Sequence, residues 1–278
     1  MAIAQNIDSS VTVADNGVNF IAVPKWSEFD WLWHGFSTRR GGVSSTYLAE
    51  MDGDRPGELN LGFTAADSAE NVRENRLRFV EAVTGSRDTP LRTVRQVHSN
   101  RSVEAGEVAL EVAVDADGLM TRQPSILIGI QTADCIPVLV ADPVNRAVAA
   151  FHAGWRGTVA RIVELGIVRM QAEFGSDPAD LFAAIGPGIG PCCYTVGEEV
   201  RTHFGANFSY AEELFQERDG ALIVDLVEAN RRQLLAAGLA ADSISVVGGC
   251  TACQQESFYS HRASGGHAGR MMAVIGIR

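Results

Sequence analysis

The sequence predicts an α/β or α+β domain in which mixed sheets are covered by outer helices. Three strand-like runs follow one another between Ile126 and Phe151, and their gaps are too short for parallel crossovers, so we expect antiparallel neighbours there. Elsewhere apolar runs alternate with amphipathic stretches. No repeat, low-complexity tract or linker interrupts this pattern, which favours a single compact unit.

Amphipathic spacing predicts three helices, over residues 68–84, 158–174 and 226–237. Asp67 and Glu70 predict a capping box at the start of the first helix, and Gly85 follows its end. The third helix begins after Asp225 and stops at Gly238. Runs rich in β-branched and apolar residues predict strands at 20–23, 32–37, 93–98, 126–131, 136–141, 147–151, 181–185, 244–247 and 273–277.

Composition and charge narrow the class of function. The chain has 278 residues, of which 46% are hydrophobic and 21% charged, values typical of a globular domain. Its net charge of −11 repels phosphate backbones and anionic lipid, so we expect no nucleic-acid partner and no membrane partner. No apolar run is long enough to span a bilayer, and the first eight residues lack a secretory signal pattern. We therefore expect a cytoplasmic protein.

Two histidines and one cysteine stand where strand-like runs end. They are His98, Cys135 and His152, and strand ends are where rigid scaffolds present reactive groups. Such a set can bind zinc with one coordination position left open, as in catalytic zinc sites. The spacing alone does not show a metal site. It is more typical of buried, satisfied residues, and it also allows a Cys135 nucleophile kept as thiolate by a histidine.

Three arginines beside glycine or polar residues are candidates to bind an anion, namely Arg39, Arg156 and Arg262. Their planar guanidinium groups could bind phosphate or carboxylate, although surface salt bridges would explain each of them as well. The glycine-rich run at 185–191 is no phosphate-binding P-loop, and we expect a turn there.

The remaining four cysteines form two short motifs. Cys250 and Cys253 make a CxxC, and Cys192 and Cys193 are adjacent. The sequence has no second CxxC, so we expect these cysteines to be packing residues rather than metal ligands. Five cysteines in all also argue against a framework of disulfides.

A series of motifs runs in order from about residue 35 to the end of the chain, at 38–44, 60–62, 71–76, 96–98, 115–118, 132–138, 152–157, 186–190, 258–262 and 269–271. Together these motifs resemble the laccase-domain, or polyphenol-oxidase-like, family, whose members are also called peptidoglycan-editing factors. The resemblance implies one catalytic domain over residues 26–278, with residues 1–25 as an N-terminal extension or first strand. It also implies a four-layer α/β/β/α fold like that of certain bacterial cysteine-hydrolase toxins.

The same resemblance implies a zinc site formed by His98, Cys135 and His152. Copper fits less well, because multicopper oxidation needs many histidine ligands and the chain has six histidines in total. The C-terminal motif departs from the family, since His261 stands where members usually have Tyr. A histidine at this position could add a titrating group or a ligand near the site, or lie on the surface.

The family resemblance also implies an activity toward purine nucleosides. Its members phosphorolyse adenosine, inosine and methylthioadenosine to base and ribose 1-phosphate, and they deaminate adenosine. The expected partners are therefore purine nucleosides and phosphate, with Arg39, Arg156 and Arg262 as phosphate ligands and Asn60 as a substrate ligand. The alternatives are a Cys135-dependent hydrolase that edits peptidoglycan precursors, a polyphenol oxidase, and a binding protein without enzymatic activity.

Overall fold

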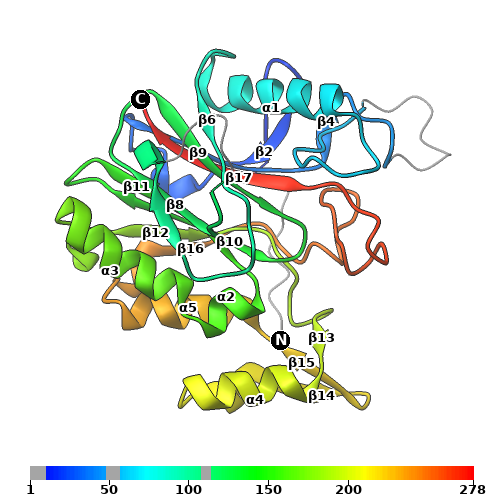
Figure 1. The fold of residues 1–278 in the computed structure, drawn as a ribbon, viewed down its shortest axis with the longest axis vertical. Coiled ribbons are helices and arrows are strands. Elements are labelled where there is room, and N and C mark those ends of the chain that lie inside the picture. The colour runs from blue at the N-terminus through cyan, green and yellow to red at the C-terminus, as the bar shows by residue number, and fades with distance from the viewer. Residues whose placement is uncertain (1–10, 48–56, 108–113) are drawn as a thin grey trace.

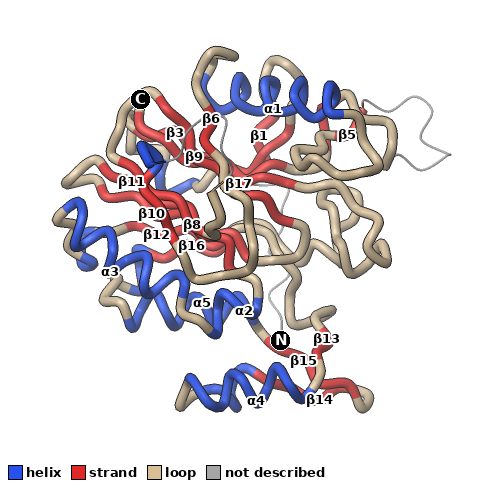
Figure 2. Tube along the Cα trace, viewed as in Figure 1, coloured by secondary structure: helices blue, strands red, loops and turns tan. Residues whose placement is uncertain are grey.

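Two large sheets stack face to face, and helices cover both outer faces (Figures 1 and 2). The structure is a computed structural model that describes residues 11–47, 57–107 and 114–278; the first ten residues of the predicted N-terminal extension lie outside it. The stacking gives the four layers α/β/β/α, so the predicted fold class is confirmed. Within the described residues, no helix has the length and apolar character to cross a membrane.

The first sheet has the chain's last strand near its centre. Its order is β1-β2-β3-β17-β9-β6, with β6 and β9 parallel and the other neighbours antiparallel. Its strands are β1 (Val11–Val13), β2 (Asn19–Ile21), β3 (Leu32–Ser37), β17 (Met271–Ile277), β9 (Ile126–Thr132) and β6 (Leu91–Arg92).

The second sheet is antiparallel at its centre and parallel at both edges. Its order is β16-β12-β10-β11-β8-β7. Its strands are β16 (Ile244–Val246), β12 (Phe182–Ile185), β10 (Ile136–Asp142), β11 (Ala147–Ala153), β8 (Gly118–Thr121) and β7 (Ser102–Glu104). Two small sheets are formed by β13 (Thr195–Val196), β15 (Ala221–Val224) and β14 (Phe215–Arg218), and by β4 (Arg40–Gly42) and β5 (Gly57–Glu58).

The central strands are apolar on both faces because both faces are covered. Along β10, Leu139 and Ala141 lie in the core between the two sheets, whereas Val138 and Val140 lie in the core under the helices. Strand β17 alternates in the same way between the inter-sheet core and the core under α1. Successive side chains of a strand point to opposite faces, so a continuous apolar run here fills two cores.

The first predicted helix forms as α1 (Ala69–Thr84), but its cap differs from the prediction. The N-cap is Ser68, whose hydroxyl accepts a hydrogen bond from the Asn71 amide at 3.1 Å. Asp67 lies one position earlier and accepts from the Asn71 side chain at 3.1 Å. Gly85 ends the helix in the left-handed conformation, as expected.

The predicted helix over 158–174 is wrong in its first turns. The structure has a short helix α2 (Trp155–Val159) and a second helix α3 (Ile162–Phe174), separated where Arg161 adopts a φ of 62°. A left-handed residue interrupts the helical hydrogen-bond ladder, and this conformation is rare for residues other than glycine. The composition of the segment gives no warning of the break.

The predicted third helix is confirmed as α5 (Leu226–Ala236), capped by the Asp225 side chain. Helix α4 (Glu198–Asn207), which packs beside the small sheet of β13, β14 and β15, was not expected. Single-turn 3₁₀ helices lie at Pro24–Trp26, Ala105–Glu107, Pro178–Asp180, Ala211–Leu214 and Ala241–Ser243.

Two strand predictions need correction. Residues 93–98 are not a strand. The Gln96 side chain, in place of a neighbouring strand's backbone, forms hydrogen bonds with Gln131: it donates to the Gln131 carbonyl and accepts from the Gln131 amide, both at 2.7 Å. Strands β9 and β10 are not antiparallel neighbours, although β10 and β11 are. The chain instead passes from one sheet to the other after β9, and this crossover carries Cys135.

Candidate active site

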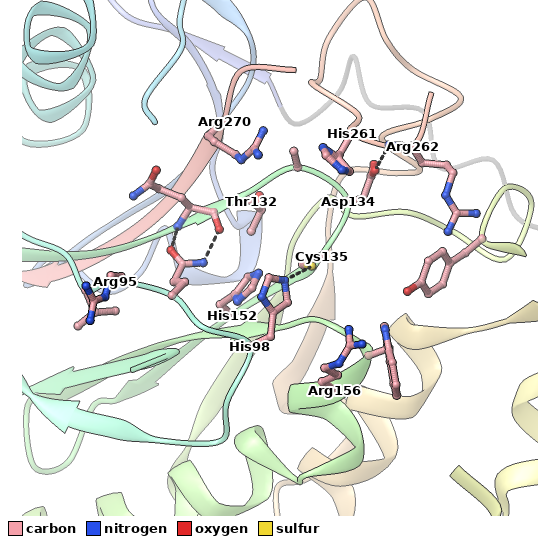
Figure 3. A pocket seen from close by; sticks show the side chains of 16 residues that line it. Arg95, His98, Thr132, Asp134, Cys135, His152, Arg156, His261, Arg262 and Arg270 are labelled. Carbon is pink, nitrogen blue, oxygen red and sulfur yellow. Dashed lines mark hydrogen bonds between the residues drawn. The ribbon is translucent and has the colours of Figure 1, made fainter. Parts of the chain in front are cut away.

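His98, Cys135 and His152 come together at one edge of the two sheets (Figure 3). Their ligand atoms all lie within 4.8 Å of one another, and His98 Nε2 lies 3.9 Å from Cys135 Sγ. The three residues come from the loop after β6, from the crossover between the sheets and from β11. The predicted association of these residues is thus present in the fold.

Asp117, just before β8, positions both histidines. Its buried carboxylate accepts a hydrogen bond from His152 Nδ1 at 2.8 Å. It also accepts from the backbone amides of Val97, His98 and Ser99 at 3.2, 3.0 and 2.6 Å, which holds His98 at a φ of 59°. In the neutral form of His152, the form that can bind a metal, Nδ1 carries the proton donated to Asp117 and the lone pair of Nε2 points away from this carboxylate.

Cys135 and His152 shift each other's pKa values toward a pair of opposite charges, a thiolate beside an imidazolium. Burial would raise the pKa of the Cys135 thiol, but the facing imidazoles of His152 and His98 lower that pKa to about 6. Burial would lower the pKa of His152, but the Cys135 thiolate and the Asp117 carboxylate raise it to about 9. Burial would also raise the pKa of Asp117, yet hydrogen bonds from His152 and Ser99 lower it to about 2.

The donor set of this trio fits a zinc ion. Two imidazole nitrogens and a thiolate are ligands that zinc prefers, and a carboxylate behind one histidine is the usual outer partner in such sites. Cys135 is partly exposed, and His98 is exposed. Three ligands that face an open pocket leave a coordination position for water or substrate.

A pocket of about 600 Å³ opens over the trio and is lined with cations. Figure 3 shows Arg95, Arg156, Arg262 and Arg270 around it. Within the described part of the chain, the Arg156 guanidinium has no hydrogen-bond or ion-pair partner and lies 4.3 Å from the centroid of the Trp155 ring. An acidic protein therefore presents a basic pocket, which attracts an anionic ligand.

Asp134 fastens the C-terminal loop to the pocket. It adopts a φ of 87° beside Cys135, and its carboxylate accepts from the Thr251 hydroxyl at 2.6 Å and from the Arg262 amide at 2.7 Å. The Arg262 guanidinium donates to the Thr195 carbonyl at 2.7 Å and lies 5.2 Å from the centroid of the Tyr194 ring. Two loops distant in sequence thereby form one wall of the pocket.

Two residues predicted as substrate ligands do not line this pocket. Arg39 pairs with Glu58 at 2.5 Å and donates to the carbonyls of Tyr47 and Gln255 at 2.9 and 2.7 Å. Asn60 is fully buried, and its side-chain oxygen accepts from the Arg270 amide at 2.9 Å. Asn60 thus reaches the pocket through the backbone of Arg270.

His261 lines the pocket with an exposed side chain. A second cavity of about 410 Å³ shares Gln131 and Arg270 with the first, and Phe63 and His267 lie in its wall. The two cavities therefore adjoin along the side chains that they share.

Sequence reasoning missed four of the residues that shape the site: Asp117, Asp134, Tyr194 and Arg270. Three of them lie inside or beside motifs that the sequence did single out, at 115–118, 132–138 and 269–271. The motif at 115–118, which contains two aspartates, was the available signal for Asp117. Nothing local to the chain indicates that Tyr194 and Arg262 meet.

Comparisons with known proteins agree with this fold and show the family. Residues 33–278 match the family described as "Multi-copper polyphenol oxidoreductase laccase". A purine nucleoside phosphorylase of Bacteroides thetaiotaomicron is 35% identical over 261 residues, covering 90% of this chain and 93% of that protein. Adenosine deaminase RL5, from an unknown prokaryotic organism, is 34% identical over 257 residues, covering 86% of this chain and 92% of its own.

Among solved structures, YlmD from Geobacillus stearothermophilus is similar to this chain with a TM-score of 0.83. It is 32% identical, and the likeness covers 97% of this chain and 99% of that one.

Proposed function

The chain belongs to the multi-copper polyphenol oxidoreductase laccase family, and on this premise we propose that it is a zinc-dependent purine nucleoside phosphorylase that also deaminates adenosine. The names of its relatives, purine nucleoside phosphorylase and adenosine deaminase, support an enzyme of this kind. The substrates of the proposed reactions are adenosine, inosine and methylthioadenosine, with phosphate as the second substrate of phosphorolysis.

One observation carries the proposal: the metal-binding trio faces a pocket lined with arginines. His98, Cys135 and His152 would hold the zinc, which when bound supplies a Lewis acid that can polarise a substrate group or acidify a water molecule. The small number of histidines, six in the chain, argues against a multicopper centre, which needs many histidine ligands, and so supports zinc.

In phosphorolysis, an oxygen of phosphate attacks C1′ of the ribose, the bond from C1′ to the purine nitrogen breaks, and the purine leaves with the electron pair and takes a proton. The phosphate must be bound and oriented for this step. Arg156 is the first candidate, because its guanidinium has no competing partner in the described residues. Arg262 forms the facing wall.

The base needs a flat, partly apolar contact, which Trp155 and Tyr194 can provide from the pocket wall. Burial raises the pKa of Tyr194 to about 12. The phenol therefore stays protonated at neutral pH and can donate a hydrogen bond to a ring nitrogen or a ribose oxygen. Deamination would use the same binding pocket with a water molecule in place of phosphate.

Product analysis by liquid chromatography and mass spectrometry tests the proposal. The zinc-loaded protein and Cys135→Ala are incubated with adenosine, with and without phosphate. We expect adenine and ribose 1-phosphate only when phosphate is present, inosine in both tubes, and neither product from the variant. Folded, zinc-loaded protein that leaves adenosine unchanged would contradict the proposal.

A second candidate is a Cys135-dependent amide hydrolase acting on peptidoglycan precursors. It is supported by the thiolate state of Cys135, whose pKa is lowered to about 6, and by His98 at 3.9 Å. Alkylation separates the two candidates: a zinc ligand is shielded from iodoacetamide until a chelator is added, whereas a free nucleophile reacts at once.

A further inference from the structure

Away from the trio, four cysteines form a second group whose ligand atoms converge. We propose that Cys192, Cys193, Cys250 and Cys253 bind one structural zinc ion as a tetrathiolate site. The proposal does not depend on the proposed enzymatic function, because it concerns a different set of ligands and no chemical step.

The distances among the four sulfur atoms suit a single ion. All four lie within 4.8 Å of one another, and Cys253 Sγ stands 3.4 Å from Cys192 Sγ and 3.3 Å from Cys193 Sγ. Sulfur ligands of tetrahedral zinc, with bonds of about 2.3 Å, stand about 3.8 Å apart. The cysteines thus already have nearly the spacing that the ion would impose.

Packing does not explain these residues. Cys192 and Cys253 are exposed, and Cys193 and Cys250 are only partly buried, whereas free cysteine is among the most buried residue types. The expectation that these cysteines are packing residues therefore fails. Sequence reasoning judged the adjacent cysteines at 192–193 and the CxxC at 250–253 separately and did not consider them as one set of ligands.

A disulfide also fits less well than an ion. Cys253 approaches Cys192 and Cys193 almost equally, so one disulfide bond would leave the other two cysteines outside it as free thiols. Cys250 Sγ accepts a hydrogen bond from the Gly190 amide at 3.3 Å. Amide donors of this kind stabilise the negative charge of thiolate ligands around a metal.

The site would join the two loops that form the arginine wall of the pocket. Tyr194 directly follows Cys193, and Thr251, between Cys250 and Cys253, donates to Asp134 at 2.6 Å. Backbone contacts add to the joint, since the Thr251 amide donates to the Gly188 carbonyl at 3.0 Å. A zinc ion there would act as a positioning element for the wall that carries Arg262.

The test is the zinc content of three forms of the full chain, purified with zinc and without chelator. Elemental mass spectrometry should give two zinc ions per chain for the wild type. It should give one for Cys135→Ala, which keeps the tetrathiolate site, and one for the double variant Cys250→Ser with Cys253→Ser, which keeps the trio.

X-ray absorption at the zinc edge identifies the ligands and does not depend on whether the double variant folds. In Cys135→Ala the remaining zinc should show sulfur ligands alone, at about 2.3 Å. Absence of zinc from Cys135→Ala, or nitrogen ligands around its zinc, would overturn the proposal. A disulfide among the four cysteines would also overturn it. Such a bond would appear in the freshly purified wild type as an intact mass 2 Da below that of the fully reduced chain.

Discussion

At the scale of single residues, Asp117 does the most to organise the candidate site. One carboxylate oxygen accepts from His152, and the group also accepts from three consecutive backbone amides around His98. Removing its charge should therefore disturb two of the proposed zinc ligands at once. A side chain that binds no metal would then control metal affinity.

We expect Asp117→Asn to weaken zinc binding by about 10- to 100-fold, the usual effect of losing an outer carboxylate. The amide NH₂ would also meet N–H donors, leaving polar groups unpaired at a cost of roughly 1–3 kcal/mol in the free energy of unfolding. Competition with a chromophoric chelator measures the affinity, and urea unfolding measures the stability. Asp115→Asn is the matched control, because the partly exposed Asp115 carboxylate pairs with Arg95 and contacts neither histidine; an equal loss in both variants would contradict this role.

His34 on β3 is a histidine that the proposed function does not use. Its Nε2 accepts from the Val23 amide at 2.9 Å, and within the described residues its Nδ1 is buried without a partner. Burial lowers the pKa of His34 to about 4, and Arg278 contributes to the same shift. The folded protein therefore holds this imidazole neutral where the unfolded chain would protonate it.

The sign of the pH effect follows from that shift. The contribution of His34 to stability is complete above its unfolded pKa of about 6.5. It is lost as the pH falls toward about 4, with a slope of at most about 1.4 kcal/mol per pH unit. Urea unfolding at several pH values should therefore show a shallower acid loss in His34→Gln than in the wild type. His203→Gln, at an exposed position, should keep the slope of the wild type.

At the scale of elements, helix α3 lies close to β11 because Gly166 has no side chain. A Cβ there would lie 2.3 Å from two ring carbons of Phe151, a fully buried core residue. The contact brings the outer helix layer onto the strand that carries His152. Either the helix or the ring has to shift when this position is enlarged.

We expect Gly166→Ala to lower the free energy of unfolding by about 1–3 kcal/mol, because overpacking outweighs the gain in helix propensity. Gly205→Ala in α4 is the control, since nothing lies within 4 Å of a Cβ there. The control should stabilise by up to about 1 kcal/mol. If both variants gained stability in urea unfolding, the close approach of α3 and β11 would be refuted.

The elements that the sequence predicted are those whose cause is local. Capping by Asp225 and the left-handed Gly85 mark helix boundaries within a few residues of chain, and apolar runs mark β9, β10, β11 and β17. The failures have distant causes. Residues 93–98 are held by the Gln131 backbone and by Asp117, and no local pattern contains these partners.

At the scale of the whole molecule, the site also has features that local sequence predicts and features that depend on distant parts of the chain. The three candidate metal ligands were predictable as residue types in identifiable motifs. Which arginines reach the pocket was not, because Arg39 and Arg156 stand in similar glycine-rich contexts and differ only in what the rest of the chain brings to them. Arg39 meets Glu58, Tyr47 and Gln255, whereas Arg156 meets the open pocket.

This difference gives the last prediction. Arg39 also lies 4.7 Å from the centroid of the Tyr259 ring, so it joins early and late parts of the chain. Arg39→Gln leaves the buried Glu58 carboxylate unpaired, and we expect a loss of about 3–5 kcal/mol in the free energy of unfolding, with the KM for phosphate unchanged. Arg156→Gln should instead raise that KM by about tenfold, the effect of one lost charge-assisted hydrogen bond, and leave stability within about 0.5 kcal/mol.

Urea unfolding and phosphate-dependent kinetics on both variants measure the two effects separately. The assignment fails if Arg39→Gln raises the KM for phosphate while Arg156→Gln does not. It holds if Arg39→Gln changes only the free energy of unfolding and Arg156→Gln changes only the KM for phosphate. Arg39 would then stabilise the contact between early and late parts of the chain, and Arg156 would bind the anion in the pocket that this contact helps to form.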